Sequence, residues 1–451
     1  MSINMWREGA ATSSLFTGQH QNCTGGTELM TTGLERISQL VKEHPDRKLQ
    51  TLMHLVNAET LAEVHNRLGR RKAAGVDGMT KAGYEENLEE NLENLLERMK
   101  QYSYRPQPVR RTYIPKDGSD QMRPLGVPAY EDKLVQGAMA DILNAVYEPK
   151  FYDCSYGFRG NRGCHQALLA LEAKLWGWTN YVVDVDIKGF FDNVDHEWMM
   201  KFLEHDIEDK NYLRYVKRFL KAGVMEEGKY YDADAGVPQG GLISPVLANV
   251  YLHYVIDMWF AKVITARSKW KAEMIRYADD VVFCFVNMVD ARRFYEALKE
   301  RLKKFGLELS EEKSKIIKFG RNAEGDGGKF DFLGFTHVTG KSKNGKFFVK
   351  RITSQRKLKA KRKIVKKWLR ENMHVPVGVL IDRLNRKLIG HYNYYGIIGN
   401  YAAMNGFREY VLDRLYCTLN RRGADNRMSK AIFTKLIAKF PVAMPKIVHR
   451  V

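Results

Sequence analysis

Four aspartates in two short apolar segments are the residues of this sequence best suited to chemistry. Asp184 and Asp186 lie two apart in the β-branched run 181–187, so in a strand both side chains point to one face. Asp279 and Asp280 lie farther along the chain in a second apolar region. Carboxylates from a strand and from a neighbouring hairpin can hold two divalent ions, which is an arrangement that catalyses phosphoryl transfer.

The second pair of aspartates lies between two predicted strands, 274–277 and 281–286, which together form a hairpin. Acids at a hairpin tip are more often ordinary solvated turn residues. Here both flanking strands are apolar, and a buried pair of carboxylates is costly without a cation. Mg²⁺ suits such a site because it prefers oxygen ligands and keeps waters for substrate phosphates.

These residues carry a resemblance to a known family. The segment Tyr277-Ala278-Asp279-Asp280 resembles the YxDD box of reverse transcriptases, and its surroundings resemble the reverse transcriptases encoded by group II introns, the intron-encoded maturases. A YxDD box alone is a weak signal, whereas a series of blocks in the same order is specific. The other blocks that carry the resemblance are 104–106, 114–118, 123–128, 155–159, 186–192, 238–245, 306–310, 332–335 and 390–396.

The resemblance covers about residues 50–435 and implies an α+β fold, a right-hand polymerase whose fingers and palm contain an antiparallel sheet and precede an all-α thumb. It divides the chain into a flexible leader (1–30), reverse transcriptase fingers and palm (31–340), a thumb or maturase bundle that binds RNA (341–435), and a short basic tail (436–451). The form expected is the one without an endonuclease domain. Hydrophobic periodicity predicts helices over 34–68, 85–99, 132–146, 196–222, 245–260, 291–305, 356–369, 377–392 and 407–419.

The resemblance also implies roles for individual residues. Asp186, Asp279 and Asp280 would be catalytic and, together with Ile187, would bind two Mg²⁺ ions, for which Mn²⁺ could substitute. Asp184 is not the matching position, and a supporting role is expected for it. The residues that would bind the incoming nucleotide are Lys116, Arg123, Phe191, Gln239 and Lys313.

Each nucleotide-binding assignment has a simpler alternative. Phe191 would block the ribose 2′-hydroxyl, but it could be plain core, and Phe190 competes for the role. A lone Lys or Arg is more often a solvated surface charge, and a Gln between Pro and Gly is often a turn residue. Lys315 lies two residues from Lys313 and competes for the position of a general acid.

Positive charge is concentrated in the last quarter of the chain. The formal net charge of the 451 residues is +20, yet the 30 residues 341–370 hold 14 Lys and Arg and no acid. A basic module on a nearly neutral body indicates a polyanionic partner rather than a merely solubilising face. The candidate RNA-binding residues are Lys359, Lys361, Arg362, Lys363, Lys366, Lys367 and Tyr394, although core packing is the alternative for each tyrosine of 392–395.

The resemblance, together with the basic C-terminal region, therefore implies an RNA-directed DNA polymerase that copies group II intron RNA into DNA and binds that RNA to assist its splicing and mobility. Expected partners are intron RNA, template RNA with a DNA primer, dNTPs and target DNA, with a homodimer possible. The apolar runs are too short to span a membrane, and a cytoplasmic location, in the bacterial cytosol or nucleoid, is expected. Two alternatives remain open: a related bacterial reverse transcriptase with a defence or other cellular role, or an RNA-binding splicing factor with an inert polymerase body.

Overall fold

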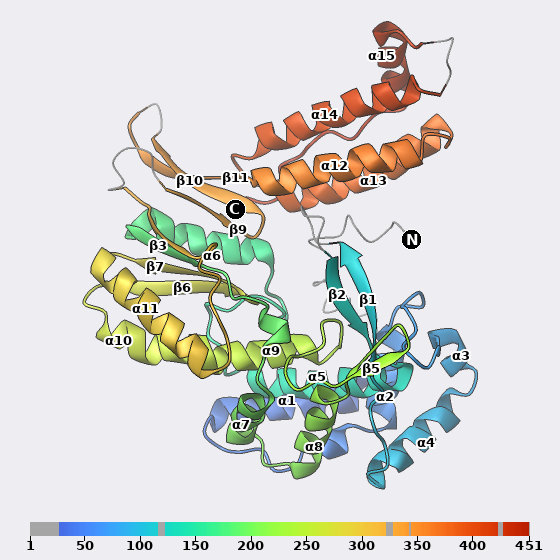
Figure 1. Cartoon of the computed structure of the whole chain (residues 1–451), viewed down its shortest axis with the longest axis vertical. Helices are drawn as coiled ribbons and strands as arrows, with labels where there is room; N and C mark the ends of the chain where they lie inside the picture. Colours follow the sequence, from blue (N-terminus) through green and yellow to red (C-terminus); the bar gives the residue numbers. More distant parts are fainter. Residues whose placement is uncertain (1–26, 116–121, 322–327, 342–343, 423–426, 451) are drawn as a thin grey trace.

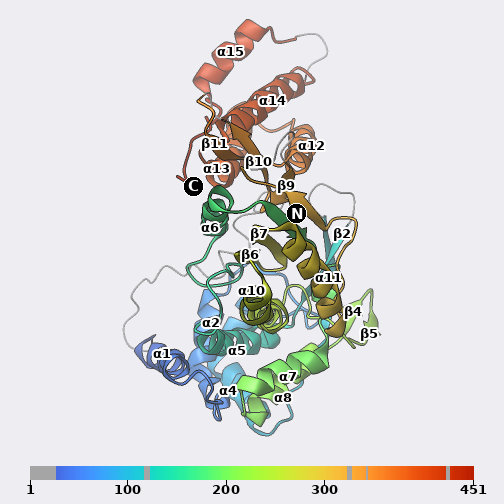
Figure 2. The same cartoon turned by 90° about the vertical axis from the view of Figure 1, so that its left-hand side faces the viewer.

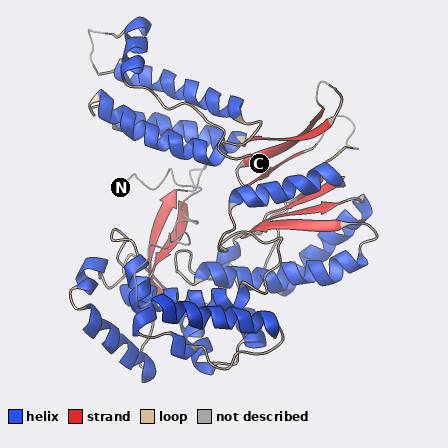
Figure 3. Ribbon diagram, turned by 180° about the vertical axis from the view of Figure 1, so that it is seen from behind, coloured by secondary structure: helices blue, strands red, loops and turns tan. Residues whose placement is uncertain are grey.

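The computed structural model describes residues 27–115, 122–321, 328–341, 344–422 and 427–450, and Figure 1 shows their arrangement. Residues 1–26 of the expected leader lie outside the described residues, and so does Lys116. Helices and antiparallel sheets alternate along the chain, which confirms the α+β class. Helices build the base and the top of the molecule, and most of the strands lie between them (Figure 3).

The base is built around helix α5 (Tyr130–Tyr147), which is buried over most of its length. The apolar sides of the neighbouring helices pack on it, and Leu61, Val64 and Leu95 are all fully buried there. This arrangement gives the lower lobe one continuous hydrophobic core. The surrounding helices are α1 (Thr27–Glu43), α2 (Ala58–Arg67), α3 (Lys81–Glu85), α4 (Leu88–Lys100), α7 (His196–Asp206) and α8 (Lys210–Leu220).

A four-stranded antiparallel sheet, which we call the palm sheet, occupies the middle of the molecule. Its strand order is β6 (Ala272–Tyr277), β7 (Asp280–Phe285), β3 (Tyr181–Val185) and β8 (Lys315–Lys318). Because side chains alternate across a strand, Val183 of β3 joins the core of the base while Val182 joins a second core on the other face. The palm sheet therefore separates two hydrophobic cores.

The base-side face of the palm sheet is covered by α11 (Met288–Lys304) and by a long helical segment. That segment runs through α9 (Ser244–Leu252), two π-helical stretches (His253–Asp257 and Phe260–Ile264) and α10 (Thr265–Arg267). A π-helical stretch inserts an extra residue into a turn and often lies near a functional site.

The other face of the palm sheet packs against α6 (Cys164–Gly177) and the upper lobe. A three-stranded antiparallel sheet of β9 (Lys329–Phe332), β10 (Phe335–Lys341) and β11 (Phe347–Thr353) leads into the helices. Figure 2 shows α6 between the palm sheet and these upper elements. The helices of the upper lobe are α12 (Gln355–Glu371), α13 (Val377–Tyr395), α14 (Tyr401–Leu419) and α15 (Lys430–Lys439).

A small sheet stands apart from the palm sheet and rises toward the upper lobe (Figure 1). Its order is β2 (Met122–Val127), β1 (Val109–Pro115), β4 (Val224–Glu226) and β5 (Lys229–Tyr231). All its neighbouring pairs are antiparallel except β1 with β4. This sheet carries Arg123, the arginine expected to bind the incoming nucleotide.

Several element boundaries differ from the expected ones. Residues 27–30 belong to α1 rather than to the leader. The helices expected over 34–68 and 196–222 are each interrupted, in both cases before an N-cap (Asn57 and Asp209) that begins a new helix. The helical upper region begins at Gln355, because 347–353 form strand β11. Helix α6 and strands β4, β5 and β8 to β11 were not predicted. Strands β4, β5, β8 and β9 hold only three or four residues, which is too few to show a period.

The buried His337 makes a prediction about stability and pH. Its ring stacks on Phe330 at 4.8 Å between ring centroids and faces Arg351, and burial lowers its pKa to about 3. Between pH 3 and about 6.5 the unfolded chain binds a proton here that the folded chain excludes. We expect the free energy of unfolding to fall as the pH drops below 6.5, by up to about 1.4 kcal/mol per pH unit for this group.

Substitution of His337 by Phe keeps an aromatic ring on Phe330 and removes the proton. His337→Phe should therefore show a shallower fall of unfolding free energy between pH 6.5 and 5 in urea titrations than the wild type. His374→Phe, which changes an exposed histidine, should leave the slope as it is. Parallel curves for His337→Phe and the wild type would show that the buried ring does not govern the pH response.

Candidate active site

The palm sheet places Asp186 beside Asp280 on two neighbouring strands. Val185 is the last residue of β3 and pairs with Val281 of β7 in an antiparallel register. Continued by one residue, this register sets Asp186 opposite Asp280, and directly opposed residues point to the same face. Asp184 lies on that face too, because it is two residues from Asp186. The carboxylates thus lie at one end of the face that turns toward α6 and the upper lobe.

The two-residue turn of the β6–β7 hairpin holds the remaining aspartate. Tyr277 pairs with Asp280, so Ala278 and Asp279 form the turn. Ala278 has a φ of 55°, in the left-handed region, which costs about 1–3 kcal/mol for a residue with a side chain. The turn also packs on Gly157, where a Cβ would lie 2.3 Å from the Ala278 nitrogen. The surrounding structure therefore has to hold this turn in place.

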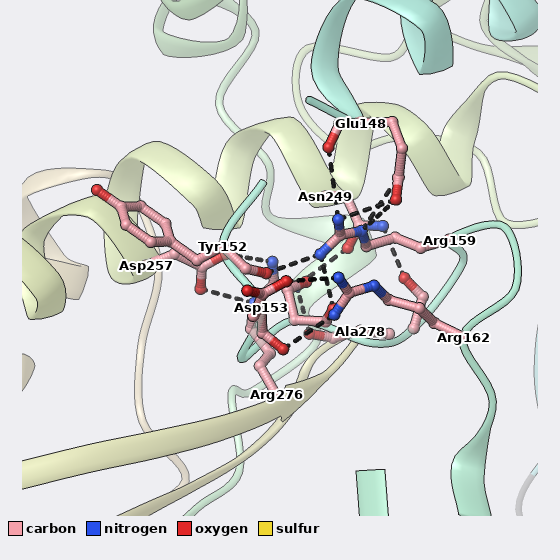
Figure 4. A network of polar contacts seen from close by, with 11 residues as sticks. Glu148, Tyr152, Asp153, Arg159, Arg162, Asn249, Asp257, Arg276 and Ala278 are labelled. Atoms are coloured by element: carbon pink, nitrogen blue, oxygen red, sulfur yellow. Dashed lines mark hydrogen bonds and ion pairs between the residues drawn. The ribbon is translucent and has the colours of Figure 1, made fainter. Parts of the chain in front are cut away.

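Arg276 supplies most of that support, as Figure 4 shows. Its side chain is fully buried and ion-paired with the equally buried Asp257, with 2.8 Å from Nε to Oδ1. The Nη1 group donates to Asn249 Oδ1 and to the backbone oxygen of Ala278, both at 3.0 Å. One guanidinium thus connects the turn to the long helical segment, whose π-helical stretch carries Asp257 and whose α9 carries Asn249.

The segment that carries Gly157 is fixed to the same arginine through its backbone. The Arg276 nitrogen donates to Cys154 O and the Tyr156 nitrogen donates to Arg276 O, each at 2.8 Å. Asn249 Nδ2 donates to Gly157 O at 2.7 Å. The turn is therefore enclosed by the Arg276 side chain and by the backbone of residues 154–157, which packs directly against it.

Arg159 binds that segment through backbone oxygens and fixes its conformation (Figure 4). Its Nη1 donates to the backbone oxygens of Tyr152 and Ser155 at 2.7 and 2.8 Å. Its Nε and Nη2 bind the carboxylate of Glu148, with 2.9 Å from Nη2 to Oε1. The block 155–159 is thus a structural support of the turn, which gives a physical reason for its residue types.

The electrostatics at the turn favour a cation. The Asp280 side chain is open to solvent on one side, but the protein around it removes much of the water from its carboxylate. This desolvation, together with the negative charges of Asp279, Asp186 and Asp184, raises the pKa of Asp280 to about 7. The pKa of Asp279 is also raised, first by burial, while the positive charge of Arg123 acts in the opposite direction. Proximity of like charges makes simultaneous ionisation costly. A divalent cation would relieve that repulsion.

The donor set fits an oxygen-preferring metal ion. The carboxylates of Asp186, Asp279 and Asp280 offer only oxygen atoms, which are the ligands that Mg²⁺ prefers. The ammonium of Lys313 already lies 3.0 Å from Asp186 Oδ2, so a positive charge is accommodated at this position. Among the described residues, no three His, Cys, Asp or Glu side chains gather closely enough to hold an ion as they stand.

The structure describes four of the five residues assigned to the nucleotide, namely Arg123, Phe191, Gln239 and Lys313. Phe191 is half-buried on the edge of the core, while Phe190 is 2% exposed and so fills the core itself. Gln239 lies in a loop, and its own backbone oxygen accepts a hydrogen bond from the Gly126 nitrogen of β2 at 2.6 Å. That contact brings the loop against the strand that carries the exposed Arg123.

The two competing lysines contact different aspartates. Lys313 pairs with Asp186, whereas Lys315 of β8 pairs in register with Asp184. Burial raises the pKa of Asp184 to about 7, and the charge of Lys315 partly opposes that rise. The side chain of Ile187 is buried and carries no ligand atom. Ile187 pairs with Leu309 in an isolated β-bridge, but the hydrogen bonds of that bridge are made by the neighbouring residues Asp186 and Lys188. Only the backbone oxygen of Ile187 could therefore serve a metal ion.

Helix α12 presents a basic surface. Its apolar residues Leu358, Val365 and Leu369 are buried, and its cations fill the opposite side. Arg362 is half-buried, with its guanidinium 5.2 Å from the ring centroid of Tyr410. We call the exposed cations the α12 basic face; they are Arg356, Lys359, Lys363, Lys366, Lys367 and Arg370.

Two of the residues expected to bind RNA lie elsewhere. Lys361 is 5% exposed, because its position turns it toward the helices packed on α12, so it does not belong to the α12 basic face. Tyr394 also faces inward, and its hydroxyl donates to Leu333 O at 2.8 Å while its ring stacks near Phe335. Both side chains are part of the packing of the upper lobe, which does not favour a surface contact, and their role in RNA binding stays a prediction.

Asp257 and Asn249, which position the turn, were not predicted from the sequence. One signal was available: Arg276 is a charged residue inside an apolar strand, and a buried charge needs a partner. The identity of the partner was not predictable, because Asp257 lies in a helical segment that sequence pattern cannot dock onto β6.

Two known families match this chain, one after the other. Residues 114–337 match a family described as "Reverse transcriptase (RNA-dependent DNA polymerase)". Residues 357–435 match a second family, described as "Group II intron, maturase-specific domain". The first match spans the palm sheet with its aspartates, and the second spans α12 to α14.

Individual relatives agree with these matches. The chain is 30% identical over 462 residues to the group II intron-encoded protein LtrA of Lactococcus lactis, an alignment that covers 83% of this chain and 75% of the relative. It is 31% identical over 351 residues to protein YkfC of Escherichia coli, covering 69% and 89%. It is 29% identical over 277 residues to a putative COX1/OXI3 intron 1 protein of Saccharomyces cerevisiae, covering 60% and 33%.

The buried ion pair makes a prediction about stability. Arg276→Met leaves the Asp257 carboxylate buried without a partner, so we expect the free energy of unfolding to fall by about 3–5 kcal/mol. The double variant Arg276→Met/Asp257→Leu, which buries no charge, should regain a large part of that loss. Urea unfolding at neutral pH measures both.

The matched control is the outer ion pair in the same view, Arg162 with Asp153, whose carboxylate side chain is 95% exposed (Figure 4). Asp153→Ala should change stability by no more than about 1 kcal/mol, as for other surface pairs. Equal losses for Asp153→Ala and Arg276→Met would contradict a special role for the buried pair.

Proposed function

This chain belongs to the family of reverse transcriptases encoded by group II introns, in which a polymerase is joined to a maturase domain, and from that premise we propose that Asp186, Asp279 and Asp280 form its catalytic centre. The chain is an RNA-directed DNA polymerase with a role in intron splicing. The observation that supports this assignment of residues is the register that sets Asp186 beside Asp280, with Asp279 held in the adjoining turn.

The reaction joins a primer 3′-hydroxyl to the α-phosphate of a deoxynucleotide and releases pyrophosphate. Reverse transcriptases use divalent metal ions, and two Mg²⁺ ions, or Mn²⁺ in their place, would stabilise the charge that develops on the phosphate. We propose that Asp186, Asp279, Asp280 and the Ile187 carbonyl hold them. Arg276 keeps the turn in the one geometry that places its carboxylates beside Asp186.

Several further side chains would act on the nucleotide itself. Arg123 is exposed, and its charge reaches Asp279, so it is placed to bind the triphosphate. Lys116 would assist it, on the strength of the sequence alone. Gln239 would line the nucleotide pocket. Lys313 would donate a proton to the leaving pyrophosphate, because its ammonium already lies at Asp186.

Intron RNA is the partner that family membership implies. We propose that the α12 basic face contacts its phosphates, since the face carries six exposed cations on one helix. Template RNA with a DNA primer, dNTPs and target DNA are proposed as further partners, and a homodimer as a possible assembly. Among the described helices, none is both long and apolar enough to cross a membrane. The bacterial cytosol or nucleoid is the proposed location.

The maturase match favours the intron role over a defence role, because it covers 357–435, the part of the chain that holds the basic helix. The three aspartates at the end of the palm sheet favour an active polymerase over an inert RNA-binding body. An inert body would extend no primer, which the next experiment examines.

Loss of Asp279 tests the catalytic assignment. Purified protein with an RNA template, a DNA primer, dNTPs and Mg²⁺ should extend the primer, and Asp279→Ala should reduce the rate by at least about a thousandfold, or ~4 kcal/mol. Affinity for intron RNA should stay within about twofold, because the residue contributes no positive charge. Asp153→Ala, which removes an exposed carboxylate, is the control and should extend normally. Extension by Asp279→Ala at the wild-type rate would remove the basis of the assignment.

Sugar selection tests the placement of Phe191. The half-buried ring of Phe191, at the edge of the core and five residues after Asp186, would exclude a 2′-hydroxyl, so Phe191→Val should raise ribonucleotide incorporation relative to deoxynucleotide by about tenfold or more, or ~1.4 kcal/mol. Phe190→Val should instead lower stability, because Phe190 is buried. A change in the incorporation ratio with Phe190→Val but not with Phe191→Val would assign the steric role to the other ring.

A further inference from the structure

A basic groove lies on the base of the molecule, away from the α12 basic face. It is a solvent-open cavity of about 480 Å³ between the end of α8, the segment before β1, and β5. Five cations line it together with the exposed ring of Tyr230, and no Asp or Glu is among its lining residues. We call this cavity the α8 groove; the five cations that line it are Arg105, Arg214, Lys217, Arg218 and Lys221.

The amphipathic pattern of α8 creates this groove. Its apolar side chains, including Tyr212, Val216 and Phe219, are buried in the base. Basic residues occupy the opposite side, where Arg214 and Lys217 are exposed. One helical turn rises about 5.4 Å, so the cations follow one another at intervals that can reach successive phosphates of one strand.

Two of the arginines are held in place before any ligand arrives. Arg218 donates from Nη1 to Tyr104 O at 2.7 Å and from Nη2 to Tyr102 O at 3.0 Å. Arg214 stacks on the Tyr102 ring, with 4.2 Å from its guanidinium carbon to the ring centroid. Ordered guanidinium groups lose less entropy on binding a phosphate.

The like charges of the groove cations repel one another. Burial, followed by the charge of Arg105, lowers the pKa of Arg218, and Arg214 acts in the same direction. Within the described part of the chain, none of the five groove cations makes an ion pair with an acid. An anion in the groove would relieve this repulsion, and the site is therefore better suited to a bound polyanion than to solvent.

The groove is remote from the upper lobe. Helix α8 lies at the opposite end of the molecule from α12, α13 and α14 in two perpendicular views (Figures 1 and 2). A large folded RNA could contact both surfaces at once.

We propose that the α8 groove binds the phosphate backbone of intron RNA, as a second contact separate from the α12 basic face. This inference rests on the proposed function, which provides an RNA large enough to reach both. RNA suits the groove better than an acidic protein, because four of the five cations follow one another along α8 and its C-cap, and Tyr230 offers a ring on which a base can stack. The contact would anchor the RNA body while the upper lobe holds another part of it.

Neutralising the groove tests the inference. The variant Arg214→Gln/Lys217→Gln/Lys221→Gln changes three exposed side chains and leaves the hydrogen-bonded Arg218 intact. Its affinity for full-length intron RNA should fall, and the slope of log affinity against log salt should shrink by about 0.7–0.9 for each phosphate that the protein no longer neutralises. Filter binding across a salt series with the full chain measures both quantities.

Charge alone is controlled by Lys262→Gln/Arg267→Gln/Lys269→Gln, which removes three exposed cations near α10. That variant should keep the wild-type salt slope, and an equal loss in both variants would overturn the inference. Lys359→Gln/Lys363→Gln/Lys366→Gln removes part of the α12 basic face. When it is combined with the groove variant, the two reductions in affinity should multiply, as expected for two separate contacts. An unchanged slope in the groove variant would also overturn the proposal.

Two further measurements separate the groove from the polymerase. A parallel loss in extension of a short template–primer would mean that the groove belongs to the polymerase path, and the proposal would be wrong. A DNA duplex that competes for the groove as well as intron RNA does would replace RNA by target DNA as its ligand and would equally reject the proposal. Wild-type extension in the same samples reports the polymerase independently, so failure of the groove proposal leaves that assignment in place.

Discussion

The buried ion pair between Arg276 and Asp257 is the interaction on which the rest of the site depends. Both side chains are fully excluded from solvent, and desolvating two charges is justified only if the pair is well bonded. Here the arginine also holds the strained Ala278 and the backbone that encloses it. A turn with a positive φ and an unfavourable group of carboxylates would relax without it. The pair thus serves the geometry at one end of the palm sheet.

The palm sheet links this local constraint to the whole molecule, because its two faces belong to different hydrophobic cores. Alternation along β3 and β7 sends Val183 and Phe283 toward the base and Val182 and Val282 toward the upper lobe. The carboxylates share the second face, so they lie toward the elements that carry the α12 basic face. The proposed catalytic carboxylates and the α12 basic face therefore lie on the side of the sheet where the maturase region packs, while the α8 groove belongs to the base.

Local pattern predicted much of this architecture. The hairpin and the strand at 181–187 followed from short apolar and β-branched runs, and the ordered blocks carried the resemblance that implied the family and the fold. Pattern could not give the docking of Asp257 onto Arg276, since that contact spans two elements whose relative placement is a tertiary property. Lys361 and Tyr394 show the same limit: neither charge pattern nor residue type gave the packing of the Lys361 side chain against the upper lobe or the hydrogen bond from Tyr394 to Leu333. Short strands such as β8 were not predicted because they hold too few residues to show a period.

The π-helical stretch at His253–Asp257 has a consequence for how the length of this chain can change. Asn249 and Asp257 both contact Arg276, although eight residues of a regular α-helix rotate by about 800°, well past two full turns. The wider turns of the stretch bring the two side chains to one side. A helix one residue shorter and regular throughout would rotate by about 700°, close to two turns, and would keep both contacts, whereas one more residue would swing the carboxylate away by about 100°. Relatives should therefore differ here by the absence of one residue and not by a further insertion, so the interval has a fixed upper length.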